Sequence, residues 1–430
     1  MTPFQLKRTL QSSIGGLWGG EPSGDSRDIA VVRVADFDYD GLVARAAPTA
    51  RQIEPNLVVK RQLCRGDLLI EKSGGGEKQN VGRVVQWVGP QRAICSNFVN
   101  RLRPAPGMDS RWLTYLHRSL YLAGFAATCT KQTTGIQNLD LDAYLAARVR
   151  VPAIDQQRRI ASFLDRELAR LRRVAERTDS LDSLRGEAVS RALRDGVGLD
   201  RWPAVQIRHV ARTGTGHTPS RERPEYWKPD ELVVPWFTLA DVWQIRDDER
   251  EVVMDTAEWV SQAGIDNSSA CKHPAETVLL SRTASVGFSA VLGREMAASQ
   301  DFMTWTCGPR LDPYFLLFVL RAIRPELRRL MYGSTHRTIY MPDLHALRTP
   351  LPPVAEQRVA VAKIRASLAP HWQMRRNTRL LRERLTEYRD ALITEAVTGQ
   401  LDVTRLSESQ LDESAHAAVE AERPEVLSAW

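Results

Sequence analysis

Two long stretches of the chain carry apolar residues at every third or fourth position, with arginine and glutamate between them. This spacing predicts one long amphipathic helix in each stretch. Each stretch begins after a proline and ends before a glycine, Gly196 in the first and Gly399 in the second, which are usual start and stop signals. Pro370 should bend or break the second helix locally. The predicted apolar stripes are Ile160, Leu164, Leu168, Leu171, Val174, Thr178, Leu181, Leu184, Ala188 and Ala192, and Val361, Ile364, Leu368, His371, Thr378, Leu381, Leu385, Tyr388 and Leu392.

The rest of the sequence has a different pattern, in which short runs rich in β-branched and aromatic residues alternate with Gly, Pro and Asp. Such runs, for example residues 29–34 and 233–237, predict short strands joined by turns. Residues 112–125 and 314–330 have apolar residues at helical spacing, so we expect a helix in each. These stretches are therefore predicted to form mixed α/β globules.

The chain also contains an internal repeat with a period close to 200 residues. Arg148-Val-Arg-Val-Pro-Ala-Ile-Asp-Gln-Gln157-Arg158 aligns without a gap with Arg348-Thr-Pro-Leu-Pro-Pro-Val-Ala-Glu-Gln357-Arg358. Shorter matches with a similar offset include Val34-Ala-Asp36 with Leu239-Ala-Asp241. Because a globule followed by a helix recurs at this period, the sequence predicts two tandem copies of one structural unit, followed by a C-terminal tail.

Two amphipathic helices in one chain bury their stripes most simply against each other, as a coiled coil. If the first helix leads from one globule to the next, the second must run back beside it. The predicted fold is α+β, with two mixed α/β globules in tandem and two long antiparallel helices as a coiled-coil spacer, forming a dumbbell with pseudo-twofold symmetry. About 39 helical residues at ~1.5 Å each give a spacer of roughly 60 Å. The predicted divisions are a first globule at 1–150, a first spacer at 151–198, a second globule at 199–350, a second spacer at 351–402 and an acidic tail at 403–430.

The charge of the chain favours an anionic partner. Its formal net charge is +7, from 59 Lys and Arg against 52 Asp and Glu. Residues 403–430 hold six carboxylates and two arginines, so the preceding residues are more basic than the whole chain. A basic body of this kind is typical of nucleic-acid binding. The sequence shows neither a run of the ~20 apolar residues that a membrane helix needs nor a signal peptide, so we expect a cytoplasmic protein.

Motifs in the sequence give no positive case for catalysis. Asp312-Pro-Tyr-Phe315 resembles the Asp-Pro-Pro-Tyr/Phe motif of amino-methyltransferases, but it opens a helical pattern, where Asp312 is expected as the N-cap. Ser73-Gly-Gly-Gly-Glu-Lys78 lacks the spacing of a phosphate-binding loop, and a hairpin or DNA-facing loop explains it better. Cys271 and His273 are only two potential metal ligands. The sequence therefore predicts no catalytic residue and no metal site in this chain.

Basic and amide side chains gather in the predicted loops of both globules. Arginine can read guanine edges, Asn and Gln can read adenine edges, and any cation can hold a phosphate. For each single residue, the alternative is an ordinary solvated surface charge. Lys72 and Arg282 are the first candidates, because each follows a predicted strand. The candidate DNA-binding residues are Lys72, Lys78, Arg83, Arg101 and Lys131 in the first globule, and Arg221, Arg223, Lys228, Arg282, Arg294 and Arg337 in the second.

These features together resemble the DNA specificity (S) subunit of Type I restriction-modification systems. The resemblance rests on Leu351-Pro-Pro-Val-Ala-Glu-Gln357, the long helix after it and Ala396-Val-Thr-Gly-Gln-Leu-Asp402. A degraded copy recurs as Val151-Pro-Ala-Ile-Asp-Gln-Gln157, and Gly216-His-Thr-Pro-Ser220 resembles the opening of a recognition domain. The first copy departs from the family pattern in having Ala153 in place of proline. The similarity spans roughly residues 1–402.

The resemblance implies that the globules are target-recognition domains, which read a bipartite, asymmetric target on double-stranded DNA. It further implies that the chain positions two adenine methyltransferase (modification) subunits and, in the full complex, restriction helicase-nuclease subunits. S-adenosylmethionine, ATP and magnesium are then expected on those partners, and no cofactor is expected in this chain. Two alternatives stay open: a DNA methyltransferase or nuclease with an unrecognised active site, and a coiled-coil scaffold without DNA specificity.

Overall fold

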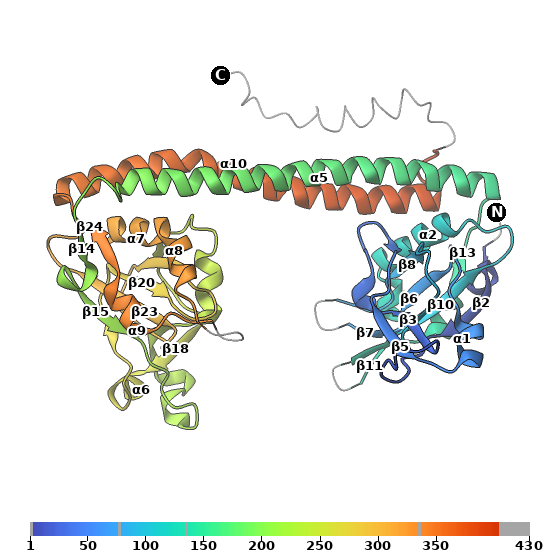
Figure 1. The fold of residues 1–430 in the computed structure, drawn as a ribbon, viewed down its shortest axis with the longest axis horizontal. Coiled ribbons are helices and arrows are strands. Elements are labelled where there is room, and N and C mark those ends of the chain that lie inside the picture. The colour runs from blue at the N-terminus through green and yellow to red at the C-terminus, as the bar shows by residue number, and fades with distance from the viewer. Residues whose placement is uncertain (1–2, 76–78, 134–135, 333–336, 404–430) are drawn as a thin grey trace, which may run out of the picture. The chain divides into compact units, whose positions relative to one another are not determined.

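The computed structural model describes residues 3–75, 79–133, 136–332 and 337–403. The chain forms two compact units. Unit 1 contains residues 1–176 and 381–430, and unit 2 contains residues 177–380. Each unit combines one mixed α/β globule with one half of each long helix (Figure 1). The five divisions expected from the sequence stay a prediction, because the compact units cut across both helical stretches.

The two long helices are α5 (Ile154–Val197) and α10 (Val354–Thr398). α10 continues through Pro370, so the expected break is wrong. Proline removes the hydrogen bond to the carbonyl of Ala366, and both residues are exposed, so water can bond that carbonyl. α5 runs one residue past Gly196, and Gly198, with φ of +61°, follows its end. Gly399, with φ of +80°, follows the end of α10 as expected.

Within unit 2 the two helices run antiparallel. Thr378 Oγ1 donates a hydrogen bond to Asp182 Oδ1 over 3.2 Å, and Gly196 lies against Ile364. Residue 182 of α5 thus contacts residue 378 of α10, and residue 196 contacts residue 364, so the two helices run in opposite directions. This confirms the predicted antiparallel pairing inside this unit. Gly196 permits the close approach, because a Cβ there would lie 2.3 Å from Cγ1 of Ile364.

The predicted apolar stripes are wrong in the middle of the helices. Leu181 and Leu184 are 50% and 61% exposed, whereas Thr178 is buried. Further along α5 the buried positions are Val189 and Leu193 rather than the predicted Ala188 and Ala192. Periodicity selects the face with most apolar residues, but the buried face is the one that the partner helix and the globule cover.

Each globule is built on a five-stranded sheet with the same strand order. Neighbouring strands are antiparallel in both sheets, except that the last pair is parallel. The repeat seen in the sequence therefore extends to the topology. The order in unit 1 is β2 (Leu10–Gly15), β10 (Val99–Pro104), β6 (Leu68–Glu71), β8 (Val84–Trp87) and β4 (Val43–Ala44), and in unit 2 it is β15 (Ala211–Thr215), β23 (Phe302–Cys307), β20 (Thr277–Ser281), β21 (Ser289–Leu292) and β17 (Val252–Val253).

Smaller sheets also correspond between the units. A central strand pairs with one antiparallel and one parallel neighbour in each. A two-stranded sheet joins the start of each globule to its end. The sheet around the central strand has the order β5 (Thr49–Gln52), β3 (Asp28–Val32) and β9 (Ala93–Cys95) in unit 1, and β18 (Glu258–Ser261), β16 (Leu232–Phe237), β22 (Met296–Ala298) and β19 (Lys272–His273) in unit 2. The two-stranded sheet pairs β1 (Phe4–Gln5) with β13 (Arg148–Val149) in unit 1, and β14 (Ala204–Gln206) with β24 (Arg348–Pro350) in unit 2.

One helix of each globule packs on its five-stranded sheet, α2 (Ser110–Leu122) in unit 1 and α7 (Pro313–Ala322) in unit 2. Both were expected from helical spacing, although α7 ends at Ala322 and a separate helix, α8, follows it. The N-caps are Asp109 and Asp312, whose carboxylates accept hydrogen bonds from backbone N–H groups of the first turn. This confirms the capping interpretation of Asp312. The shorter helices are α1 (Pro55–Arg61), α3 (Phe125–Thr128), α4 (Leu141–Leu145), α6 (Gln262–Asp266), α8 (Arg324–Arg329) and α9 (Met341–Ala346).

One buried glutamine ties the start of each long helix to its globule. Gln157 accepts a hydrogen bond from the backbone N–H of Asp109 at 2.8 Å, and its amide donates to the carbonyl of Pro152 at 2.8 Å. Gln357 accepts from the backbone N–H of Asp312 at 2.8 Å, and its amide donates to the carbonyls of Pro352 and Arg310, also at 2.8 Å. Both side chains therefore join the long helix to the N-cap of α2 or α7.

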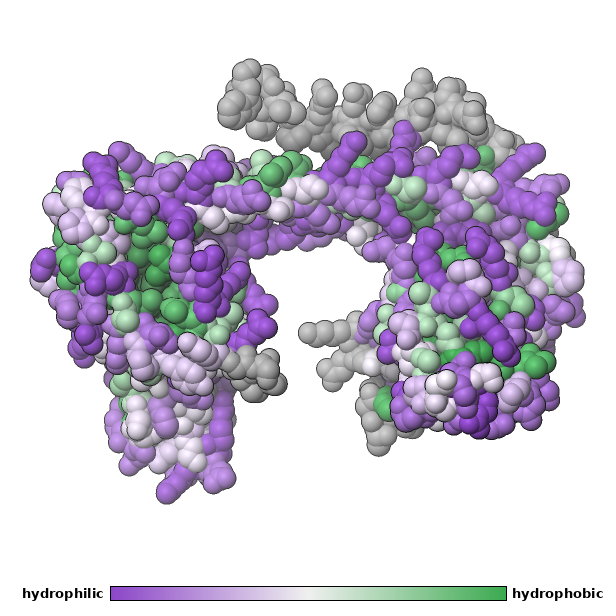
Figure 2. Space-filling model, viewed as in Figure 1, coloured by the Kyte–Doolittle hydropathy of each residue, from purple (hydrophilic) through white to green (hydrophobic). Residues whose placement is uncertain are grey.

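The long helices also contribute to the cores of the units. In unit 1, Leu164 of α5 and Ile393 of α10 belong to the same apolar cluster as Trp112 of α2. In unit 2, Leu193 of α5 and Ile364 of α10 pack into the cluster that contains Phe315 of α7. The visible faces of both units are mainly hydrophilic, with scattered apolar patches (Figure 2). No helix in the described ranges is both long and apolar enough to cross a membrane.

Replacing Gln357 by alanine should reduce the free energy of unfolding by about 1–3 kcal/mol, because the N–H of Asp312 and the carbonyls of Pro352 and Arg310 lose their bonds to this side chain. Urea denaturation followed by circular dichroism measures this loss. Gln373→Ala is the matched control, since Gln373 is exposed on the same helix and bonds only to Asn377 and Arg376. Equal losses in the two variants would contradict the assignment.

Candidate nucleic-acid interface

A small three-stranded sheet of unit 1 brings together two of the predicted basic residues. Its order is β11 (Thr130–Thr133), β12 (Ile136–Leu139) and β7 (Ser73–Gly74). Lys131 lies opposite Asn138, which in turn lies opposite Ser73. The N–H of Leu139 donates to the carbonyl of Lys72 at 2.8 Å. The sheet therefore places Lys131 on β11 and Lys72, directly before β7, on the two sides of β12.

The two lysines differ in their contacts. Lys131 is exposed, and its Nζ lies 2.8 Å from Oδ2 of Asp140. This hydrogen bond raises the pKa of Lys131 and lowers the pKa of Asp140, so both groups are charged at neutral pH. The other oxygen of Asp140 caps α4 by accepting from the N–H of Ala143 at 3.1 Å. Lys72 is half-buried, and its side chain makes no hydrogen bond or ion pair with the residues that the structure describes. Its ammonium group is thus available to a phosphate or a base.

The equivalent region of unit 2 holds Arg282 and Arg337. Thr338 forms bridges with both Thr283 and Tyr332, and the N–H of Ile339 donates to the carbonyl of Arg282 at 2.9 Å. Arg337 is exposed. The guanidinium of Arg282 donates to the carbonyls of Gln300 at 2.9 Å and Ile339 at 3.1 Å. Arg282 therefore holds two loops together and has fewer donors left for DNA than its position in the sequence indicated.

A second basic group of unit 2 lies around two tryptophans whose rings are tilted against each other. The guanidinium carbon of Arg221 is 3.9 Å from the ring centre of Trp227, whose own ring packs against Trp236. The three cations of this group are exposed, and each faces a carboxylate, so their charges are partly cancelled. Their partners are Glu258 for Arg221, Glu225 for Arg223 at 3.4 Å and Glu231 for Lys228 at 3.1 Å. Arg294 is exposed, and its guanidinium lies 5.4 Å from the ring centre of Trp259.

The structure does not support two of the predicted DNA contacts. Arg101 is only 3% exposed, and its guanidinium donates to the carbonyl of Gln62 at 2.9 Å and to Oγ of Ser12 at 3.3 Å. Arg83 is largely buried, forms a 2.8 Å ion pair with Glu71 and covers the ring of Tyr39. Both arginines are therefore engaged by other groups of unit 1. Lys78 lies outside the described residues.

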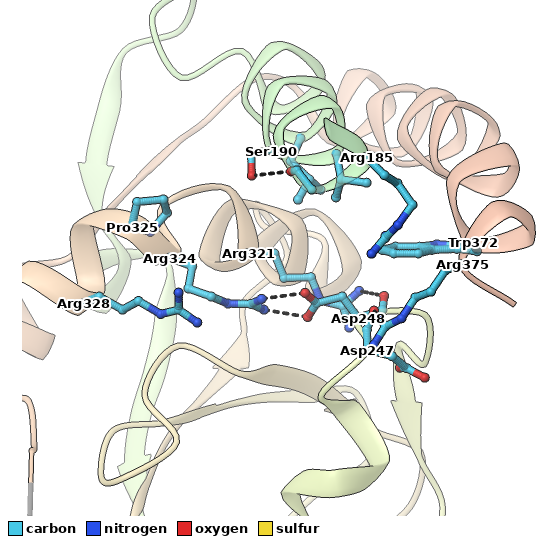
Figure 3. Close-up of a pocket in the computed structure, with 13 residues that line it drawn as sticks. Arg185, Ser190, Asp247, Asp248, Arg321, Arg324, Pro325, Arg328, Trp372 and Arg375 are labelled. Carbon is cyan, nitrogen blue, oxygen red and sulfur yellow. Dashed lines mark hydrogen bonds and ion pairs between the residues drawn. The ribbon is translucent and has the colours of Figure 1, made fainter. Parts of the chain in front are cut away.

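A further basic cavity of about 230 Å³ lies in unit 2, beside α5, α8 and α10 (Figure 3). Arg324 binds both oxygens of Asp248, at 2.5 and 2.6 Å. Arg321 is buried and donates to the carbonyls of Asp248 and Arg250 at 2.6 and 2.7 Å. Burial lowers the pKa of the Arg321 guanidinium. Burial also opposes ionisation of Asp248, but the hydrogen bond from Arg324 outweighs it, so the pKa of the Asp248 carboxyl is lowered. The guanidinium groups of Arg321 and Arg324 therefore hold the loop at residues 247–248 in place, and we assign this cavity a structural role.

The described residues contain no cluster of three or more potential metal ligands. Cys271 and His273 are neighbours, with Sγ 3.7 Å from Nε2, but no third ligand joins them. Burial lowers the pKa of His273 to about 4, so the imidazole is neutral at physiological pH. Its Nδ1 faces the hydroxyl of Thr304 at 3.4 Å, which is a packing contact within the sheet.

Sequence reasoning missed two exposed tyrosines beside Arg337. Tyr332 and Tyr340 are 57% and 55% exposed, and their ring centres are 5.8 Å apart. The search of the sequence considered only basic and amide side chains. The repeat could have drawn attention to Tyr340, because it stands 200 residues after Asp140. Asp140 directly precedes α4, and Tyr340 directly precedes the corresponding helix, α9.

Comparison with known proteins shows what part of the chain is similar to. Residues 200–367, all within unit 2, match the model of the Type I restriction modification DNA specificity domain. The Type I restriction enzyme MjaIX specificity subunit of Methanocaldococcus jannaschii is 24% identical over 162 residues, which are 37% of this chain and 36% of that protein. Unit 2 is therefore similar to the Type I restriction modification DNA specificity domain.

A second relative and a solved structure are also similar to this chain. The putative type I restriction enzyme MjaX specificity subunit, from the same organism, is 28% identical over 97 residues, which cover 21% of this chain and 22% of that protein. These matches span little more than a third of the relatives' length. A chain solved in work on the assembly and conformational transition of the type I R-M system shares the fold, with a TM-score of 0.69 and 18% identity over 93% of this chain and 98% of that chain.

The different contacts of Arg282 and Lys72 predict different effects of alanine substitution. Arg282→Ala should reduce the free energy of unfolding by about 1–2 kcal/mol, because two carbonyls lose a charged donor. Lys72→Ala should change it by less than about 0.5 kcal/mol. Urea denaturation of the two variants side by side checks this, and a larger loss for Lys72→Ala would show that the two contacts are misassigned.

Proposed function

We propose that the chain is the non-catalytic subunit that recognises DNA for a Type I restriction-modification complex, with one half-site read by each unit. The observation that carries this proposal is the repeated topology. The DNA specificity domain matches unit 2, and unit 1 has the same five-strand order and the same parallel last pair. A chain with two domains of one architecture suits a target with two separate halves.

The surface chemistry supports a target that is not a palindrome. At corresponding positions the cross-strand contact joins Ser73 to Asn138 in unit 1 but Thr283 to Thr338 in unit 2. Lys72 of unit 1, whose side chain has no bonding partner among the described residues, corresponds to Arg282 of unit 2, whose guanidinium donates to two carbonyls. Sequence is read by side chains at base edges, so different side chains on one scaffold select different bases. The two half-sites should therefore differ.

Catalysis in this proposal belongs to partner subunits. The methyl transfer from S-adenosylmethionine, and the ATP- and magnesium-dependent restriction, would be carried out by methyltransferase and helicase-nuclease subunits. The helices leave apolar side chains uncovered that a protein partner could bury, among them Leu184 and Leu380 of unit 2, 61% and 54% exposed. The duplicated fold supplies two similar helix-and-globule surfaces, so it favours two copies of one methyltransferase.

Replacing residues 199–350 by the corresponding globule of a related specificity subunit should change one half of the methylated sequence only. The replaced segment lies between the end of α5 and the start of α10, so it leaves both helices intact. Methylome sequencing of cells that carry the chimera and its methyltransferase gives the result. Exchange of residues 1–150 is the matched control and should change the other half.

The same experiment separates the rival functions. Altered bases in both halves after one exchange would contradict one half-site per unit. A protein without DNA specificity would leave the methylation pattern unchanged in both chimeras. Activity of the purified chain alone, without partners, would instead indicate an active site in this chain.

Saturating the chain with its methyltransferase should give a complex with two methyltransferase subunits per specificity chain, because the repeat offers two similar surfaces. Native mass spectrometry measures this ratio directly. Deleting residues 199–350 removes one globule and should reduce the ratio to one. A ratio of one for the full chain at saturation would contradict the symmetric assembly.

A further inference from the structure

One cross-strand contact occupies the same place in both units but has different chemistry. In unit 1, Lys131 lies opposite Asn138 and pairs with Asp140, two residues beyond it. In unit 2, Tyr332 lies opposite Thr338, and its ring packs against Tyr340, again two residues beyond. A salt bridge in one unit thus corresponds to an aromatic pair in the other.

The backbone around this contact shows that the two positions are equivalent. Leu139 and Ile339 are buried, and each donates its N–H to the carbonyl of the residue that follows β6 or β20. The next residue of that segment forms a side-chain hydrogen bond to the facing strand in both units. Ser73 donates to Oδ1 of Asn138 at 2.7 Å, and the hydroxyls of Thr283 and Thr338 are 3.1 Å apart. Asp140 and Tyr340 directly precede α4 and α9. The scaffold is therefore common, and the exposed side chains differ.

The tyrosine pair has the character of a contact surface. The residue between Thr338 and Tyr340 is fully buried, which fixes the strand, while more than half of each tyrosine is exposed. Two adjoining rings present apolar area with hydroxyl groups at its edge, the combination that is enriched where proteins bind a partner. The neighbouring Arg337 is exposed and suits a phosphate. The Lys131–Asp140 pair offers no comparable apolar area.

We propose that Tyr332 and Tyr340 contact the C5-methyl group of a thymine in the half-site read by unit 2. This inference rests on the proposed function and names a specificity determinant within it. The thymine methyl is the apolar group that base edges display in the major groove, and an exposed aromatic pair is suited to cover it. The polar pair at the equivalent place in unit 1 makes no such contact, so the two units differ in what this position selects.

Deoxyuridine in place of thymidine removes only the methyl group, so it tests the contact directly. The chain in complex with its methyltransferase is titrated with duplexes that carry the mapped target, each with one thymidine replaced. One replacement, in one half-site, should weaken binding about three- to tenfold. The variant Tyr332→Ala/Tyr340→Ala should bind the thymidine and deoxyuridine duplexes equally at that position.

Two controls isolate the ring surface. Tyr332→Phe/Tyr340→Phe keeps the rings and should keep the sensitivity to deoxyuridine, and Lys131→Ala, in unit 1, should keep it as well. Circular dichroism and thermal melting establish that each variant is folded, and Tyr332→Ala alone serves if the double variant is not. Wild-type binding that no deoxyuridine alters, or an alanine variant that remains sensitive, would overturn the proposal.

The remaining outcomes are also decisive. If the alanine variant binds every sequence more weakly by the same factor, the tyrosines contact the DNA backbone and the methyl contact is wrong. If the wild-type complex prefers no DNA sequence at all, the proposed function itself fails. Specific binding without any effect of deoxyuridine leaves the function intact and removes only this determinant.

Discussion

The buried amides of Gln157 and Gln357 fix the relation between globule and helix in each unit. A primary amide donates and accepts at once, so one side chain can bond a helix N-cap and the carbonyls of the preceding turn. Glutamate would lack the donor, and asparagine would be one carbon shorter. Because α2 and α7 pack on the sheets, the amide also sets the position of each sheet against its segment of long helix. Every strand-end residue of the candidate interface depends on that placement.

The two units share one scaffold and differ in side chains at their strand ends. The five-strand order, the capping aspartates and the buried glutamines recur in both units, whereas Lys131 and Asp140 of unit 1 correspond to Tyr332 and Tyr340 of unit 2. The glutamines are buried and the aspartates are hydrogen-bonded, so changing them costs stability. Exposed side chains at strand ends carry little stability and are free to differ. The structure thus separates residues that hold the fold from exposed residues that differ between the units.

Much of this fold could be predicted from the sequence. The repeat, the two long helices and the capping role of Asp312 follow from local patterns, because periodicity and cap chemistry are local. Burial in the second half of α5 was predicted only in part. Thr178, which belongs to the predicted stripe, is buried, whereas Leu184 is exposed, and only the partner surface decides this. The candidate site was predicted less well. Arg101 and Arg83 read as surface cations, yet Arg101 is 3% exposed and donates to Gln62 and Ser12, and Arg83 pairs with Glu71 and covers the ring of Tyr39.

The interleaved composition of the units has a consequence for synthesis on the ribosome. Unit 2 is continuous, from residue 177 to residue 380, whereas the core of unit 1 includes Leu392, Ile393 and Val397 of α10. The globule translated first therefore lacks part of its core until almost the whole chain has emerged. Multidomain chains generally fold from the N-terminus onward, but here the later globule can finish first. The core of the first globule is therefore completed after the core of the second. Until α10 has been synthesised, the apolar side chains that it covers in unit 1 are exposed.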